Sequence, residues 1–230
     1  TGSGKSTTLA GMIDHINSNL KKHIITLEDP VEYVFDDNSC VIEQREVGLD
    51  TPSYEKGLKH VMRQDPDVIM IGEMRDATSF RAAMSASDTG HLVMSTLHTI
   101  DAPQSISRVL DFFASEEREQ VRKQMVGTLK AIIVQRMAVR EDGGVVPAIE
   151  IMINTPTITK LISENRTEKL HAAIETGTDD GMQNFNQSLF QLVKDGVISK
   201  EEALDKASNP QALEMNFKGI FLSEGNRILN

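Results

Sequence analysis

The sequence predicts an α/β fold with an open, mostly parallel sheet, and three apolar runs are the main reason. The runs cover residues 23–27, 68–71 and 92–97, and stretches of helical periodicity separate them. The second run is apolar at every position, as in a strand that is buried on both faces of a parallel sheet. Alternating strands and helices favour such a sheet, and ligands bind it at the carboxyl ends of its strands. The polar side chains that follow the three runs are Glu28, Glu73 and His98.

The chain opens on a phosphate-binding loop, TGSGKSTT, at residues 1–8. The loop matches the end of the pattern G-x-x-x-x-G-K-[ST]; the first glycine of that pattern would lie upstream, as would the strand that feeds the loop. Glycines let backbone N–H groups wrap a phosphate, and the following helix adds partial positive charge at its N-terminus. We expect Lys5 to reach the β- and γ-phosphates, Ser6 to hold Mg²⁺ and Thr7 to contact the next phosphate. The predicted nucleotide-binding residues are Thr1, Gly2, Ser3, Gly4, Lys5, Ser6 and Thr7. The alternative is a flexible, solvated Gly–Ser terminus.

A helix follows the loop and begins at Lys5 or Ser6. Its apolar residues share one face at helical spacing; they are Leu9, Met12, Ile13, Ile16 and Leu20. The strand at residues 23–27 comes next, and Pro30 closes it. A further helical stretch covers residues 80–87, between the second and third apolar runs.

The carboxylates at the strand ends are candidates for catalysis. Glu73 can accept a hydrogen bond from an attacking water and help to hold the Mg²⁺ shell, directly or through water, since phosphoryl transfer needs mainly positioning and charge stabilisation. Glu28 and Asp29 repeat this arrangement one strand earlier. The structural alternatives are a solvated strand-end glutamate for Glu73, and a helix or turn cap for Glu28 and Asp29.

Two histidines bracket the strand at residues 92–97. His98, at its carboxyl end, is placed to donate to a γ-phosphate and so to report its presence. His91, at the other end, is less well placed. A structural hydrogen bond is the alternative for both. Arg75 is a weaker candidate, because it can face either a neighbouring subunit or solvent.

The chain becomes mostly helical from Ile100 onward, apart from one hairpin over residues 135–153 with Asp142-Gly143-Gly144 at its turn. Residues 155–230 look all-helical, and Ser199 and Glu202 have the spacing of a capping box. We therefore predict a core over residues 1–154, truncated within the phosphate loop, and a helical C-terminal subdomain over residues 155–230.

Composition excludes several function classes. The net charge of -10 argues against broad binding to a phosphate backbone, so a nucleic-acid partner is not expected. Cys40 is the single cysteine, which rules out an internal disulfide and does not supply a zinc site, so no zinc is expected. No run of 18 apolar residues is present.

Four motifs in this order resemble the secretion-type ATPases that power type IV pili and type II secretion. They are the phosphate loop at 1–8, the aspartate box IITLEDPVEYVF at 24–35, the Walker B region RQDPDVIMIGEMRD at 63–76 and the histidine box TGHLVMSTLHT at 89–99. The resemblance implies a RecA-like P-loop NTPase core that hydrolyses ATP with Mg²⁺. It also implies a homo-hexameric ring at the cytoplasmic face of the inner membrane. The implied partners are an inner-membrane platform protein and related pilus motor ATPases, so the chain would meet the membrane only through partners.

Within this family, the chain resembles the pilus-retraction branch of PilT and PilU type. The extension and type II secretion motors carry a tetracysteine zinc motif after the histidine box, and residues 138–151 hold no cysteine. The segment GMQNFNQSLFQLV at 181–193 also resembles the retraction branch. Residues 157–166 depart from its motif AIRNLIREGK, and Phe35 stands where a histidine often ends the aspartate box. These departures leave a principal and an accessory retraction motor both open.

The family's motor domain follows a second domain that supplies arginines to the neighbouring nucleotide site. An arginine finger is worth about 10³- to 10⁵-fold in rate, so we expect these 230 residues alone to hydrolyse ATP slowly. Three alternatives remain. One is a pilus-extension or type II secretion ATPase, another is a low-turnover accessory subunit of the same ring, and the third is a RecA-like nucleic-acid motor.

Overall fold

The computed structural model describes residues 2–220, so Thr1 of the predicted phosphate loop lies outside the described residues. Contacts group the described chain into two units. The sheet unit comprises residues 5–98 and 109–128, and the hairpin unit comprises residues 2–4, 99–108 and 129–220. None of the helices in these ranges has the length and apolar composition that a bilayer crossing requires.

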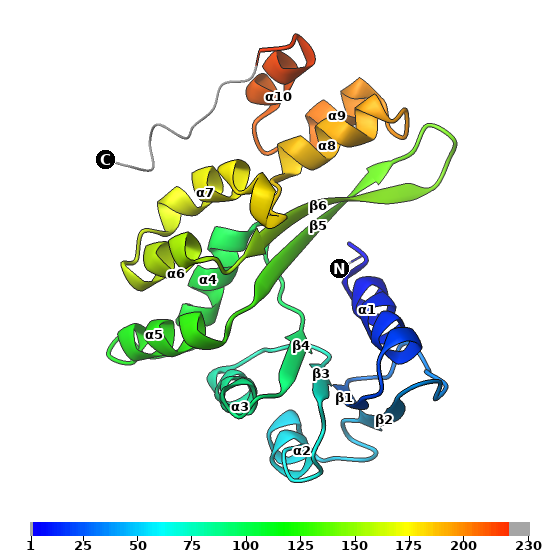
Figure 1. The fold of residues 1–230 in the computed structure, drawn as a ribbon, viewed down its shortest axis with the longest axis vertical. Helices are drawn as coiled ribbons and strands as arrows, with labels where there is room; N and C mark the ends of the chain where they lie inside the picture. The colour runs from blue at the N-terminus through cyan, green and yellow to red at the C-terminus, as the bar shows by residue number, and fades with distance from the viewer. Residues whose placement is uncertain (1, 221–230) are drawn as a thin grey trace. The chain divides into compact units, whose positions relative to one another are not determined.

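The sheet unit is built on four parallel strands in the order β2-β1-β3-β4 (Figure 1). The strands are β1 (His23–Glu28), β2 (Val41–Glu46), β3 (Val68–Ile71) and β4 (Leu92–Ser95). The predicted parallel α/β architecture is therefore confirmed. Every side chain of β3 is buried, as the unbroken apolar run predicted.

Helices cover both faces of this sheet. Ile13 of α1 (Lys5–Asn19) packs with Ile24, Val68 and Met70 on one face. The opposite face, with Ile25, Leu27, Ile69 and Ile71, packs against α2 (Tyr54–Val61) and α3 (Ala77–Asp88). Because side chains alternate along a strand, Glu28 projects to the same face as Ile24, which is the face that α1 covers.

Two details of the sheet differ from the sequence prediction. β4 ends at Ser95, so Thr96 and Leu97 lie beyond the strand that was expected to include them. β2 was not predicted, because its sequence VIEQRE contains charged side chains and no unbroken apolar run. It lies at an edge of the sheet, where charged side chains are common in natural strands.

The hairpin unit is organised by two long antiparallel strands, β5 (Ala131–Val139) and β6 (Val145–Ile153). They are joined at the predicted turn, where Gly143 and Gly144 have φ of 94° and 77°, a conformation that favours glycine. Five α-helices follow the hairpin in the described part of the chain. These are α6 (Pro156–Ser163), α7 (Leu170–Thr176), α8 (Phe185–Lys194), α9 (Lys200–Lys206) and α10 (Pro210–Phe217). One face of the hairpin packs against α8, α9 and α10 (Figure 1). The expected domain division between residues 154 and 155 stays a prediction.

One of the two contacts of the predicted capping box is present at the start of α9. Ser199 accepts the backbone N–H of Glu202, as expected for a helix cap. The Glu202 carboxylate, however, accepts the N–H of Val139 at 2.8 Å. Glu202 therefore attaches α9 to the end of β5.

Glu150 is a buried carboxyl group in the middle of β6, with 1% of its surface exposed. It accepts the backbone N–H of Ala102, the first residue of α4 (Ala102–Asp111), at 2.8 Å. Burial raises the pKa of Glu150, and the Asp101 carboxylate adds to this, while the Ala102 N–H, His171 and Arg136 act in the opposite direction. The carboxyl group is thus held in an environment that disfavours its charged form.

We expect the effect of Glu150→Gln on stability to depend on pH. Because the pKa of Glu150 is higher in the folded than in the unfolded protein, the folded state takes up the proton first as the pH falls. The free energy of unfolding of the unsubstituted protein, compared with that of Glu150→Gln, therefore increases as the pH falls. The increase begins near the folded-state pKa of Glu150 and ends near the usual pKa of 4.5. The slope is at most about 1.4 kcal/mol per pH unit.

Urea unfolding of both proteins at a series of pH values measures this difference. Glu141→Gln, a change at an exposed position of the hairpin turn, is the matched control and should show no such slope. A pH-independent difference for Glu150→Gln would contradict the raised pKa.

Candidate functional site

The ends of three parallel strands lie at one edge of the sheet unit. Leu27, Ile71 and Ser95 are aligned across β1, β3 and β4, so the residues that follow each of them emerge together. His98 Nε2 lies 3.1 Å from Oε2 of Glu73. The structure therefore brings together the predicted catalytic pair from the Walker B region and the histidine box.

Arg75 joins two of the candidate carboxylates. It forms an ion pair with Glu73, and its Nη1 lies 3.7 Å from Oδ2 of Asp29. The Glu73 side chain is 16% exposed, whereas that of Arg75 is 61% exposed. An exposed cation thus compensates a largely enclosed carboxylate. The sequence alone left Arg75 between a subunit contact and solvent, and the structure places it beside Glu73 and Asp29.

Glu28 is buried and has its hydrogen bonds satisfied within the sheet unit. Its Oε1 accepts from the Thr26 hydroxyl at 2.7 Å and from the Gln44 amide at 3.2 Å. Buried carboxylates require such partners, because an unpaired charge out of water is costly. Gln44 also donates to the carbonyl of Tyr33 at 2.7 Å, so Glu28 and the aspartate box share one hydrogen-bonded cluster.

The residues of the phosphate loop have the backbone that such a loop needs. Gly2 and Gly4 have φ of 78° and 80°, and α1 begins directly after them at Lys5. Positive φ favours glycine at both positions, and the first turn of α1 carries Lys5 and Ser6 at a helix N-terminus. The hydroxyl of Thr7 lies 2.9 Å from that of Tyr33, so the aspartate box contacts the start of α1.

Two further residues at the strand ends, Thr96 and Tyr54, were not singled out from the sequence. The Thr96 hydroxyl donates to the carbonyl of Gly72 at 2.7 Å and so joins the ends of β3 and β4. A Cβ at Gly72 would lie 3.2 Å from the Tyr54 hydroxyl and 3.4 Å from Cα of Glu28. Burial raises the pKa of Tyr54, and the carboxylates of Asp29 and Glu28 add to the rise, whereas Arg75 opposes it.

His91 does not reach this edge. Its Nδ1 lies 2.9 Å from the carbonyl of Ala86 and 3.1 Å from the Thr89 hydroxyl, at the end of α3. The reason is topological, since His91 precedes β4 and the amino ends of parallel strands lie at the opposite edge. The contacts of His91 are those of the structural alternative, a histidine that closes a helix end.

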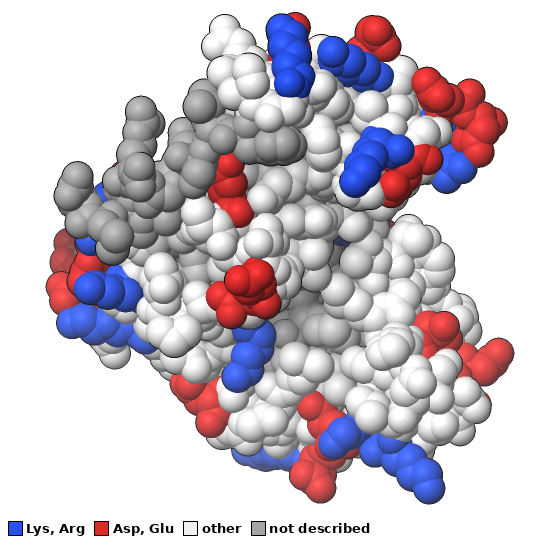
Figure 2. All heavy atoms as spheres, turned by 45° about the horizontal axis from the view of Figure 1, so that its top comes forward, with Lys and Arg blue, Asp and Glu red and all other residues white. Residues whose placement is uncertain are grey.

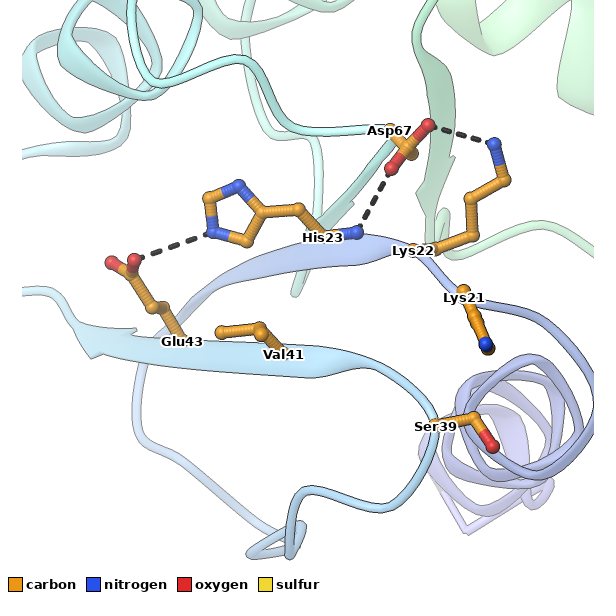
Figure 3. Close-up of a pocket in the computed structure, with 7 residues that line it drawn as sticks. All are labelled: Lys21, Lys22, His23, Ser39, Val41, Glu43 and Asp67. Atoms are coloured by element: carbon orange, nitrogen blue, oxygen red, sulfur yellow. Dashed lines mark hydrogen bonds and ion pairs between the residues drawn. The ribbon is translucent and has the colours of Figure 1, made fainter.

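A shallow pocket of about 450 Å³ lies at the amino ends of β1 and β2 (Figure 3). Asp67 there accepts from Lys22 at 2.7 Å and from the backbone N–H of His23 at 2.9 Å. Lys22 lowers the pKa of Asp67, so this ion pair joins the starts of β1 and β3 at ordinary pH. The pocket is separate from the carboxyl edge that holds Glu73 and His98.

The residues at the carboxyl edge fit a nucleotide-bound Mg²⁺. Magnesium keeps several waters and binds through one or two carboxylates and substrate phosphates, so it needs no cage of protein ligands. No group of three histidine, cysteine or acidic side chains forms such a cage within residues 2–220. Glu73 would supply such a carboxylate. The buried hydroxyl of Ser95 has no hydrogen-bond partner in the described structure.

Comparison with known proteins decides the family. The model of the type II/IV secretion system proteins matches residues 1–143. The chain belongs to this family. All four motifs lie within the matched residues.

The chain is similar in sequence to ATPases of type IV pili. It is 46% identical to the type IV pilus retraction ATPase PilT of Pseudomonas aeruginosa, over 92% of this chain and 61% of PilT. It is 42% identical to the type IV pilus ATPase PilU of the same organism, over 95% of this chain and 57% of PilU. A structure of the pilus retraction motor PilT with bound ADP superimposes with a TM-score of 0.85 at 44% identity, covering 93% of this chain and 60% of that one. The chain thus spans about three fifths of these relatives.

We expect Gly72→Ala to destabilise the protein by about 1–2 kcal/mol. The new Cβ would press on the Tyr54 hydroxyl and the β1 backbone, and overpacking of this kind outweighs the small gain from a stiffer unfolded chain. Urea unfolding measures the change. Tyr54→Phe removes the nearest atom, so the same glycine substitution should cost less in that background.

Gly127→Ala in α5 (Arg118–Thr128) is the matched control, because a Cβ there meets nothing within 4 Å. It should be neutral or stabilising. Equal effects of the two glycine substitutions would show that the approach of Tyr54 to Gly72 imposes no constraint.

Proposed function

We propose that this chain is the motor domain of an ATPase that powers the retraction of type IV pili. One observation carries the proposal: Glu73 and His98 lie within hydrogen-bonding distance at the sheet edge, in a chain 46% identical to a pilus retraction ATPase. The buried Glu28 and the glycine conformations of the loop support it.

In the proposed reaction, the backbone of residues 2–4 and the N-terminus of α1 bind the phosphates of ATP. Lys5 pairs with the β- and γ-phosphates, and the Ser6 hydroxyl together with Glu73 would hold Mg²⁺. Bound Mg²⁺ supplies positive charge against the phosphate oxygens. Glu28, which is already hydrogen-bonded, adds a fixed negative charge on the side of the sheet that α1 covers.

Glu73 positions the attacking water. The water oxygen forms a bond to the γ-phosphorus, its proton moves toward Glu73, and the bond from phosphorus to the ADP oxygen breaks. His98, 3.1 Å from Glu73, donates to the γ-phosphate. Arg75 forms an ion pair with Glu73, so we propose that Arg75 and the positive charge that accompanies a bound nucleotide compete for this carboxylate.

The retraction branch is favoured over extension and secretion motors because residues 138–151 offer no cysteine for a zinc motif. PilU-type accessory motors remain a second candidate, given 42% identity to PilU. A nucleic-acid motor is disfavoured by the net charge of -10, and on the face drawn in Figure 2 the basic side chains are interspersed with acidic ones.

The proposed setting follows from the family. We propose a homo-hexamer at the cytoplasmic face of the inner membrane that acts on a platform protein, alongside related pilus motor ATPases. Because the chain matches only 61% of PilT, we propose that residues outside these 230 complete neighbouring sites and that turnover by these 230 residues alone is slow.

We expect Glu73→Gln in the full-length protein to lower ATP turnover by at least about 100-fold, because the glutamine amide cannot accept the proton of the attacking water. ATP affinity should stay within about threefold. Lys5→Ala should instead weaken ATP binding, since it removes the charge that faces the phosphates. Phosphate release and fluorescent-nucleotide titration measure the two properties.

Glu55→Gln, at an exposed position of α2, is the control and should leave both properties unchanged. Turnover by Glu73→Gln at the unsubstituted rate would remove Glu73 from the mechanism. Retraction itself is tested by expressing the parent in a piliated bacterium that lacks its own retraction ATPase; retraction by the parent, and none by Glu73→Gln, is expected.

A further inference from the structure

The turn that follows His98 is fixed by local hydrogen bonds. Thr99 and Ser105 share a hydroxyl contact of 2.6 Å, and the backbone N–H of Ile100 donates to Gln104 at 2.9 Å. Asp101 accepts the N–H of Gln104 at 2.7 Å and so caps α4. Residues 99–101 are therefore rigidly attached to the first turn of this helix.

Two long-range contacts then attach this turn to the hairpin. Glu150 of β6 accepts the Ala102 N–H, and Arg136 of β5 donates from Nη2 to the Ile100 carbonyl at 3.3 Å. The two side chains project from the same face of the hairpin, because Arg136 pairs with Ala148 in the strand register. All of these contacts lie within the hairpin unit.

Arg136 also contacts the far end of the helical region. Its Nη1 donates to the carbonyl of Lys206, the last residue of α9, at 2.9 Å. Its guanidinium lies 3.8 Å from the ring centroid of Phe185. One planar group therefore holds the carbonyls of Ile100 and Lys206, which are 106 positions apart in the sequence, in one fixed geometry.

We propose that Arg136 and Glu150 are positioning residues that couple His98 to the end of α9. The chain passes from the sheet unit to the hairpin unit at the peptide bond between His98 and Thr99. A displacement of His98 on nucleotide binding acts on a turn that these two side chains hold, and Arg136 carries it to Lys206. This inference rests on the proposed ATPase function, because the displacement requires a nucleotide at Glu73 and His98.

The test uses the full-length parent and hydrogen–deuterium exchange, with and without ATPγS and Mg²⁺. Arg136→Met keeps the apolar stem over Phe185 but loses both carbonyl contacts; Arg136→Lys keeps the charge but not the planar fork. Arg140→Met, which removes a surface ion pair with Asp142 beside the same hairpin, is the matched control. Turnover and ATPγS affinity are measured for each variant.

In the unsubstituted protein and the control, ATPγS should change exchange in residues 99–104 and in residues 204–209. Both Arg136 variants should keep the first response and lose at least about two thirds of the second. Their turnover should fall about tenfold, equivalent to about 1.4 kcal/mol in the activation barrier, while ATPγS affinity stays within about threefold. Arg136 variants that match the control in both responses and in turnover would overturn the proposal.

If the full-length protein binds no ATPγS, the proposed function is wrong. The hydrogen bond from the Ala102 N–H to Glu150 is then tested separately. Without nucleotide, the Ala102 amide should exchange slowly, and Glu150→Leu should speed its exchange at least about tenfold more than it speeds the exchange of the β3 amides. Fast exchange of this amide in the unsubstituted protein would contradict this hydrogen bond on its own.

Discussion

The shared register of β1, β3 and β4 is the constraint on which the site depends. Backbone hydrogen bonds align Leu27, Ile71 and Ser95, so the chain leaves all three strands at one level. Bonds beyond the strands extend this alignment by one residue: the Gly72 N–H donates to the Leu27 carbonyl at 2.7 Å, and Thr96 donates to Gly72. Glu73 follows Gly72 by one residue and His98 follows Thr96 by two residues, so their side chains can meet.

Charge balance is the second feature of the site. Glu73, Asp29 and Glu28 place three carboxylates near one edge, which would be unfavourable without compensation. Arg75 pairs with the first two, and hydrogen bonds from Thr26 and Gln44 satisfy the third. A nucleotide that brings Mg²⁺ would supply positive charge at the same carboxylates. Arg75 is exposed, whereas Glu73 is largely enclosed.

Local patterns in the sequence were sufficient for much of the fold. The buried strands β1 and β3 follow from unbroken apolar runs, and α1 follows from the spacing of its apolar residues. The edge strand β2 was missed because half-exposed, charged strands resemble loops. The pairing of Glu73 with His98 was anticipated, since it needs only parallel topology. The roles of Tyr54 and Thr96 in fixing Gly72 were not, because they depend on how α2 packs and on where β4 ends.

The contacts of the hairpin unit show most clearly what local patterns omit. Glu150 and Ala102 are 48 residues apart, and neither belongs to a motif. Burying the guanidinium of Arg136 and the carboxyl of Glu150 disfavours their charged forms, and an apolar pair at these positions would often be as stable. An apolar pair, however, cannot hold the Ile100 carbonyl, the Lys206 carbonyl and the Ala102 N–H in one geometry. The cost of burying both groups is therefore offset by specificity: together they define where the turn after His98 lies relative to the end of α9.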